Sequence, residues 1–182
     1  LISELGMTES QLGMVSAFYF MPVAILAIII GRALDKYSVK NFMMIGAVIY
    51  AIGLFSLSFI NSYLSLLTIY LTVLALGSIM MGNLAVAKLI SNWFDKNAGR
   101  ALGIAAVGIS FSGVVLPLVV DPLLDLVGWR NVYVIFASVI LFIILPLIFF
   151  TVIDDPKSVN QAKDGIKREN EEESLPHELT AK

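Results

Sequence analysis

One group of charged residues combines an acid with bases in a spacing that suggests a specific role. Residues 31–40 read GRALDKYSVK, so that Asp35 stands among several basic side chains between two apolar stretches. A carboxylate at the rim of a membrane can cap the positive N-terminus of a neighbouring helix or pair with a base. Basic residues alone would be explained as a topology signal, but that signal does not explain the acid. We therefore interpret Gly31, Asp35, Lys36 and Lys40 as a functional unit.

Few polar side chains inside the apolar stretches could contact a solute. Asn83 lies deep in the apolar stretch of residues 64–90, with Ser78 nearby, and Tyr19 lies in that of residues 11–30. A buried amide in lipid needs a polar partner or water. Either a neighbouring helix or a bound solute would satisfy Asn83. Lys88, near the end of the stretch of residues 64–90, is expected to extend its ammonium group to the membrane surface.

The sequence offers no basis for catalysis or for a bound cofactor. It contains no cysteine, and its one histidine, His177, lies in a polar tail. The apolar stretches contain no Asp, Glu or His, so they cannot form a proton relay. There is no nucleophile beside a base, no cluster of metal ligands and no phosphate-binding loop. We expect neither an enzyme nor a metal or cofactor site, and a net charge of −2 does not suggest a nucleic-acid partner.

The elements that carry these residues are long apolar helices. Hydrophobic residues make up 58% of the 182 residues and charged residues 14%, against about 25% charged in ordinary soluble domains. A membrane helix needs about 20 apolar residues. Five stretches meet this requirement: residues 11–30, 42–60, 64–90, 101–120 and 132–153. The predicted fold is therefore an all-α, polytopic membrane bundle over residues 1–153, followed by a polar, disordered cytoplasmic linker over residues 154–182.

The basic residues are distributed unevenly between the two sides of the predicted bundle. With five spans, every Lys and Arg except Arg130 falls on one side. The positive-inside rule assigns that side to the cytoplasm. We therefore expect a multi-pass protein of the plasma membrane, with residue 1 outside and the C-terminal tail in the cytoplasm.

Two motifs resemble those of a known transporter family. Residues 31–40 resemble the G-x-x-x-D-R-x-G-x-R/K signature that major facilitator transporters carry between their second and third helices, with Ser38 in place of its second glycine. Residues 93–104 resemble the W-F-x-K-R-R-G-x-A-x-G-I motif of the monocarboxylate and oxalate/formate antiporter branch, although Asn97 and Ala98 replace two basic residues. The residues that agree with this branch signature are Trp93, Phe94, Lys96, Gly99, Ala101, Gly103 and Ile104.

The resemblance implies an assignment for each part of the chain. The five spans would be helices two to six of the N-terminal six-helix half, without the first helix and the second half. The signature around Asp35 would latch the two halves together on the cytoplasmic side, with Lys36 and Lys40 as anchors and pairing partners. Small residues on one face of the fourth span would pack against the opposite half. These residues are Ala101, Ala105, Gly108 and Ser112.

The function implied is secondary active transport of a small solute by alternating access. The branch resemblance indicates an organic anion, such as a monocarboxylate or dicarboxylate. Two alternatives stay open: a drug or metabolite exporter of the same fold, and a membrane accessory or scaffold protein that transports nothing. The expected partners are the solute, the lipid bilayer and the missing C-terminal half.

Overall fold

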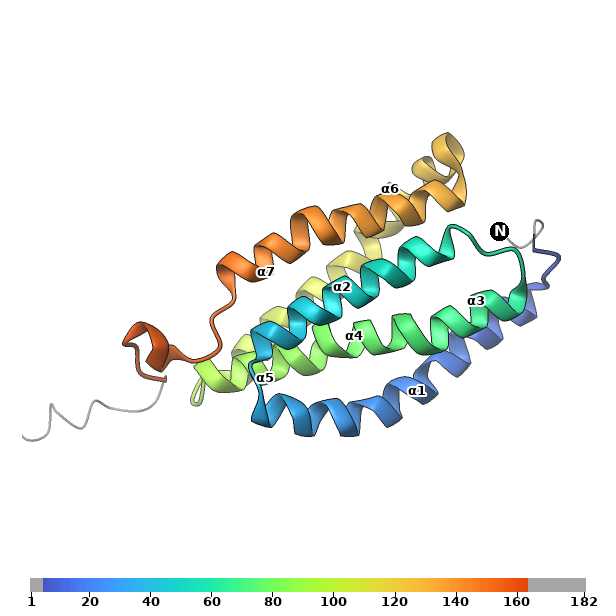
Figure 1. The fold of residues 1–182 in the computed structure, drawn as a ribbon. Coiled ribbons are helices and arrows are strands. Elements are labelled where there is room, and N and C mark those ends of the chain that lie inside the picture. The colour runs from blue at the N-terminus through green and yellow to red at the C-terminus, as the bar shows by residue number, and fades with distance from the viewer. Residues whose placement is uncertain (1–4, 164–182) are drawn as a thin grey trace, which may run out of the picture.

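A computed structural model describes residues 5–163 of the chain, and within this range every regular element is a helix. The helices run back and forth in neighbouring, antiparallel rods (Figure 1). An all-α bundle is thereby confirmed. The elements in order are α1 (Glu9–Lys36), α2 (Val39–Leu57), α3 (Tyr63–Ile69), the π-helical segment η1 (Tyr70–Leu74), α4 (Ala75–Met81), α5 (Asn83–Trp93), α6 (Ala98–Val139), the π-helical segment η2 (Ile140–Ile144), α7 (Leu145–Thr151) and the 3₁₀ helix η3 (Pro156–Val159).

The last apolar segment makes two passes. Four continuous helical segments of the described chain are long and apolar enough to cross a membrane, and the last of them covers 54 residues from Ala98 to Thr151. A straight helix of that length would be about 80 Å long, more than twice the thickness of a bilayer core. Gly128, at φ 76° and ψ 158°, breaks the helix, and the chain turns back there (Figure 1). Each of the five apolar stretches overlaps one of the resulting helical segments, while their bounds as membrane spans stay a prediction.

Helix α1 is longer than its apolar stretch suggests. A capping box between Thr8 and Gln11 begins it, and it continues to Lys36. The helix extends beyond the apolar stretch of residues 11–30, because Gly31, Asp35 and Lys36 are all helical. The turn between α1 and α2 consists of Tyr37 and Ser38 alone. Asp35 is therefore held in a fixed direction by the last turn of a helix.

Helix α2 packs most closely on α4. The close approach depends on glycines, because a Cβ atom at Gly46 would lie 2.6 Å from the Cβ of Met80. One added at Gly77 would lie 2.7 Å from the backbone nitrogen of Tyr50. Small residues allow such approach in membranes, where van der Waals packing drives helix association. The α2–α4 contact is the tightly packed centre of the bundle.

The third pass, predicted as one helix, is interrupted twice. The π-helical segment Tyr70–Leu74 widens it near the first end. Gly82 then adopts φ −88° and ψ −151° and separates α4 from α5. A glycine fits there because a Cβ atom would lie 2.3 Å from the carbonyl oxygen of Ser78. Asn83, expected inside a helix, is instead the first residue of α5.

The first part of the predicted disordered linker is folded. After α7 the chain forms the 3₁₀ helix Pro156–Val159, in which Pro156 is fully buried. Asn160 then adopts a left-handed conformation with φ 56°. Disorder is thus wrong for residues 154–163, because a buried proline and local caps fix this segment against the bundle. Residues 164–182 lie outside the described residues, and so does the prediction made for them.

Candidate functional site

The predicted latch residues, Gly31, Asp35, Lys36 and Lys40, lie at one end of the bundle, which we call the basic end. The ends of α1, α5 and α7 and the starts of α2 and α6 meet there (Figure 1). Asp35 of α1 and Lys88 of α5 form an ion pair, with 2.6 Å between Oδ1 and Nζ. The Asp35 side chain is 71% exposed and that of Lys88 30% exposed. The pair joins two passes while leaving most of the carboxylate accessible.

Lys36 and Lys40 both lie against aromatic rings in the structure. The ammonium group of Lys36 lies 5.7 Å from the ring centre of Tyr37, and that of Lys40 lies 4.9 Å from the ring centre of Phe149. Both distances fit cation–π contacts. Helix α1 continues through Lys36, and Asp35 pairs with Lys88 of α5. The predicted role of Lys36 and Lys40 as anchors and pairing partners of the latch stays a prediction.

A cleft of about 330 Å³ lies beside the ion pair. Gly31 and Leu34 of α1 line one side, and Leu84 and Ser91 of the α5 pass line the other, with Asp35 on the rim. A Cβ atom at Gly31 would already lie 3.9 Å from a methyl carbon of Leu84, so glycine keeps this cleft open. An apolar floor with a carboxylate at its edge can receive a helix that presents its positive N-terminus.

Asp154, which no sequence motif singled out, holds the start of α2. Its carboxylate accepts hydrogen bonds from the hydroxyl of Ser38 and from the backbone N–H of Lys40, the latter at 2.6 Å. Ser38 also accepts a bond from the N–H of Asn41 at 3.2 Å and so caps α2. The serine that replaces the signature glycine therefore has a structural role of its own. An acid at a helix N-terminus is the residue that the helix dipole favours.

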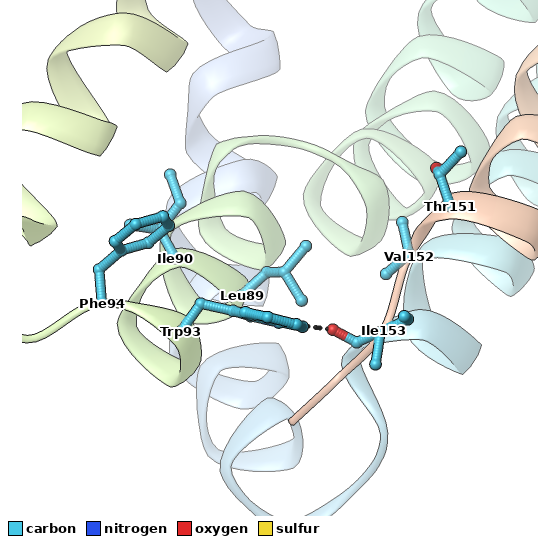
Figure 2. A pocket seen from close by; sticks show the side chains of 7 residues that line it. All are labelled: Leu89, Ile90, Trp93, Phe94, Thr151, Val152 and Ile153. Atoms are coloured by element: carbon cyan, nitrogen blue, oxygen red, sulfur yellow. Dashed lines mark hydrogen bonds between the residues drawn. The ribbon is translucent and has the colours of Figure 1, made fainter. Parts of the chain in front are cut away.

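Two of the branch-signature residues line an apolar pocket at the same end. Figure 2 shows this pocket, about 390 Å³ in volume, between the end of α5 and residues 151–153. Trp93 and Phe94 line it, and the indole Nε1 of Trp93 donates to the carbonyl of Ile153 at 2.7 Å. The amide of Asn92 donates to the carbonyl of Asp154 at 3.0 Å. Backbone carbonyls after α7 are thus bound to side chains at the end of α5.

The remaining branch-signature residues lie at the start of α6, away from this network. Ile104 is 68% exposed, and a Cβ atom at Gly99 or Gly103 would meet nothing within 4 Å. Lys96 precedes the helix, while Ala101 lies in its first turns. In the described residues these positions are not brought together with Trp93 and Phe94.

The small-residue face of α6 is partly covered within residues 5–163, since Ala101, Ala105 and Ser112 are half-buried while Gly108 is exposed. A Cβ atom at Gly108 would meet no atom within 4 Å, and the hydroxyl of Ser112 donates to the carbonyl of Ile109 in its own helix. Ala101 and Ala105 share that face by their helical spacing. The packing of this face against the opposite half stays a prediction.

Two of the three solute-contact candidates meet inside the bundle. The hydroxyl of Tyr19 in α1 donates to that of Ser78 in α4 at 2.6 Å. The ring of Tyr70 lies edge-on to Tyr19, with 6.1 Å between ring centres. Tyr133 interacts in turn with Tyr70, and Tyr50 lies near both Tyr19 and Tyr70. Sequence reasoning missed three of these tyrosines, because only folding shows that side chains from separate passes share one polar cluster.

Asn83 stands apart from the tyrosine cluster. It is exposed at the start of α5, directly after the break at Gly82. Breaks of this kind, which expose the N-terminus of a half-helix within a membrane span, occur at the substrate sites of transporters. The amide of Asn83 is therefore placed where a solute could reach it.

The comparison with protein families decides what kind of protein carries this arrangement. The family model of the Major Facilitator Superfamily matches residues 1–176, nearly the whole chain. The chain belongs to the Major Facilitator Superfamily. The chain thus comes from a family whose curated relatives are named as transporters. Its membership agrees with the motif around Asp35 and with the all-α bundle of long apolar helices.

Curated relatives of this Major Facilitator chain are named as transporters of different solutes. It is 30% identical to the probable nitrate transporter NarT of Staphylococcus aureus, over 76% of this chain and 35% of that protein. It is 28% identical to the probable sulfoacetate transporter SauU of Cupriavidus necator, over 75% of this chain and 31% of that protein. It is 30% identical to the fujikurins efflux protein of Gibberella fujikuroi, over 56% of this chain and 22% of that protein. No solved structure matches the chain.

This Major Facilitator chain spans about a third or less of each of those relatives. Within residues 5–163, no group of acids and histidines is arranged to hold a metal ion. The described site consists of ion pairs and hydrogen bonds between helix ends. Such contacts can form and break as helices move, which is the kind of change a transporter requires.

Proposed function

We propose that the complete protein is a secondary active transporter that moves a small organic anion, a monocarboxylate or dicarboxylate, by alternating access. Family membership over residues 1–176 is the observation that carries transport. The choice of an anion is supported by the branch motif around Trp93 and Phe94. It is further supported by two relatives named for anions, sulfoacetate and nitrate.

The proposed orientation puts the basic end of the bundle in the cytoplasm. Within the described residues, Arg130 is the basic side chain placed at the opposite end, beside the turn at Gly128. The positive-inside rule then places the plasma-membrane protein with residue 1 outside. In this orientation the Asp35 cleft and the pocket at Trp93 both face the cytoplasm.

The proposed role of Asp35 is to form part of a cytoplasmic latch with the second half of the transporter. Its carboxylate is paired with Lys88 on one side and is still 71% exposed at the rim of a cleft. A surface pair of this kind contributes only about 0.2–1 kcal/mol to stability. The proposed contribution of Asp35 is therefore to the closing and opening of the cytoplasmic side, where the exposed face of its carboxylate can bind a helix N-terminus of the second half.

Transport by purified protein in liposomes tests the latch. Asp35→Asn should slow uptake strongly while membrane insertion stays intact, and Asp121→Asn, a control carboxylate in α6 at the opposite end, should leave uptake near its normal rate. The chain contains no cysteine, so a single Ser91→Cys reporter in the cleft can be followed by maleimide labelling. Labelling should become faster in Asp35→Asn if the latch has opened. Normal uptake together with unchanged labelling would exclude this role.

The proposed anion needs a positive charge that the described spans do not supply. Away from the helix ends, Lys88 is the basic side chain that residues 5–163 place in a span, and Asp35 already pairs with it. An anion near the midplane needs a cationic counterpart, which we expect in the rest of the complete protein. The described polar contacts to the solute would come from the Tyr19–Ser78 pair and from Asn83.

An exporter of a drug or metabolite is the second candidate, favoured by the relative named for fujikurins efflux. Counterflow with labelled carboxylates in liposomes separates the two. Exchange that is accelerated by an unlabelled monocarboxylate or dicarboxylate supports the anion carrier. Exchange that ignores every carboxylate but responds to an uncharged metabolite supports the exporter. If neither is transported, the accessory or scaffold alternative takes their place.

A further inference from the structure

A polar pocket of about 510 Å³ lies beyond the end of α5, where the chain leaves α7. Ser91 and Asn92 form its wall on the α5 side. Lys157, Gln161 and Lys163 form the other wall, from the segment that follows α7. The lining thus combines two lysines, two amide side chains, a serine and the acid Asp155. The hydroxyl of Ser91 already donates to the carbonyl of Lys88, and the amide of Asn92 donates to the carbonyl of Asp154. The pocket adjoins the Asp35 cleft, with which it shares Ser91, and it shares no lining residue with the apolar pocket at Phe94.

Local hydrogen bonds fix the segment that carries the two lysines. The side chain of Asp155 accepts from the backbone N–H of Lys157 at 2.9 Å and begins the 3₁₀ helix. The N–H of Gln161 donates to the carbonyl of Pro156 at 2.9 Å, and Pro156 itself is fully buried. The backbone at Lys157 and Gln161 is therefore held in place before any ligand binds.

The charges around this pocket favour an anion. The carboxylate of Asp155, which also lines it, already accepts the N–H of Lys157. The ammonium group of Lys163 is 3.9 Å from the carboxylate of Asp95, at the outer limit for an ion pair. Among the described residues of the basic end, the acids are Asp35, Asp95, Asp154 and Asp155, and the bases are Arg32, Lys36, Lys40, Lys88, Lys96, Arg100, Lys157 and Lys163. The excess of basic residues leaves a positive field in which an anion would concentrate.

We propose that this pocket binds a phosphate group. A phosphate offers several strong acceptor oxygens and up to two negative charges, which match the two lysines and the side-chain amide of Gln161 in the lining. The group could belong to free phosphate or to the headgroup of a phospholipid in the adjacent leaflet, since both present the same oxygens. A bound phosphate would join the end of α5 to the segment after α7, next to the Asn92–Asp154 bond.

The test uses the complete protein, purified and delipidated in detergent, with thermal unfolding as the readout. Inorganic phosphate should raise the melting temperature in a saturable way. The double variant Lys157→Gln/Lys163→Gln should weaken the apparent affinity for phosphate by about tenfold or more, because each lost charged hydrogen bond is worth roughly that factor. The charge-matched double variant Arg32→Gln/Arg100→Gln changes basic residues of the same end that do not line the pocket. It should keep the affinity within about threefold of the original protein.

A second arm separates the two sources of phosphate. The same proteins are reconstituted into lipid discs of phosphatidylglycerol or of phosphatidylcholine. Stabilisation by phosphatidylglycerol that needs both lysines, with no response to inorganic phosphate, identifies the lipid headgroup as the ligand. The single variants Lys157→Gln and Lys163→Gln replace the double variant if it does not fold. The proposal is overturned if stabilisation by inorganic phosphate and by phosphatidylglycerol is the same with and without the two lysines. It is also overturned if the charge-matched control loses as much affinity as the lysine variant.

Discussion

Replacing Asp154 with asparagine should loosen the basic end of the bundle. The carboxylate of Asp154 receives hydrogen bonds from the hydroxyl of Ser38 and the N–H of Lys40, and it lies at the N-terminus of α2. Asparagine keeps the shape of the side chain and one acceptor oxygen. It removes the negative charge and places an amide N–H₂ opposite one of the two donors.

The size of the effect follows from these contacts. Hydrogen bonds to a charged group contribute about 1.5–3 kcal/mol and those between neutral groups about 0.5–1.5 kcal/mol, so the change costs about 1 kcal/mol for the bond that survives. Loss of the favourable interaction with the helix dipole adds roughly 0.5 kcal/mol. One donor left facing an amide N–H₂ adds a further penalty of at least about 1 kcal/mol. Together these contributions lower the expected free energy of unfolding of Asp154→Asn by about 2.5 kcal/mol.

The assay is reversible unfolding of the complete protein in mixed detergent micelles, with Asp155→Asn as the matched control. Asp155 is the next residue and is also an acid, but its side chain caps only its own 3₁₀ turn. Its replacement should cost no more than about 0.5 kcal/mol, as is usual at exposed positions. A second readout is limited proteolysis after α7, which should become faster in Asp154→Asn alone.

Equal stabilities of the two variants would refute this reasoning. In that case the hydrogen bonds of Asp154 would contribute no more than an exposed cap, and the segment after α7 would not be held by α2. A loss of stability confined to Asp154→Asn, together with faster proteolysis after α7, would show that the folded start of the linker is packed as part of the bundle.

Three further predictions use the same unfolding measurement. Ser38→Ala should cost about 1 kcal/mol, because it removes both the cap of α2 and the bond to the neighbouring carboxylate; no change would show that the cap is dispensable. Gly77→Ala should cost about 1–3 kcal/mol, since its Cβ atom would meet the backbone of α2 at 2.7 Å. The control Gly13→Ala, with nothing within 4 Å of the added Cβ atom, should not destabilise the protein. Equal effects of the two substitutions would contradict the tight α2–α4 contact. Tyr19→Phe removes the 2.6 Å bond to Ser78 and should cost about 0.6 kcal/mol of stability, as the loss of an interhelical hydrogen bond in membranes does on average. A strong loss of solute exchange at this small cost in stability would support a solute contact.

The amino-acid sequence could predict the features that depend on lipid and on local chain geometry. The low share of charged residues and the length of the apolar stretches predict membrane helices, because the bilayer core fixes the length of a span. The motif around Asp35 indicated the family and marked a position that the structure places at an ion pair. These inferences need only side-chain polarity and spacing along the chain.

The partners of those residues could not be predicted, because they come from distant parts of the chain. Asp35 pairs with Lys88, which is 53 residues away, and Asp154 lies 116 residues from Ser38. The same holds for the tyrosine cluster around Tyr70, which draws on separate passes. A hydrogen bond between helix ends depends on how the helices are placed side by side, and hydropathy says nothing about that placement.

The sequence by itself determined the fold class, the family and the apolar passes, since these follow from the transfer of side chains into lipid and from a local motif. The tertiary structure alone decided where α1 ends, that the third pass breaks at Gly82, and that the chain after α7 folds back onto α2 and α5. Each of these depends on a contact made across the bundle. The close approach at Gly77, the cap supplied by Asp154 and the burial of Pro156 exist only once the helices have packed together.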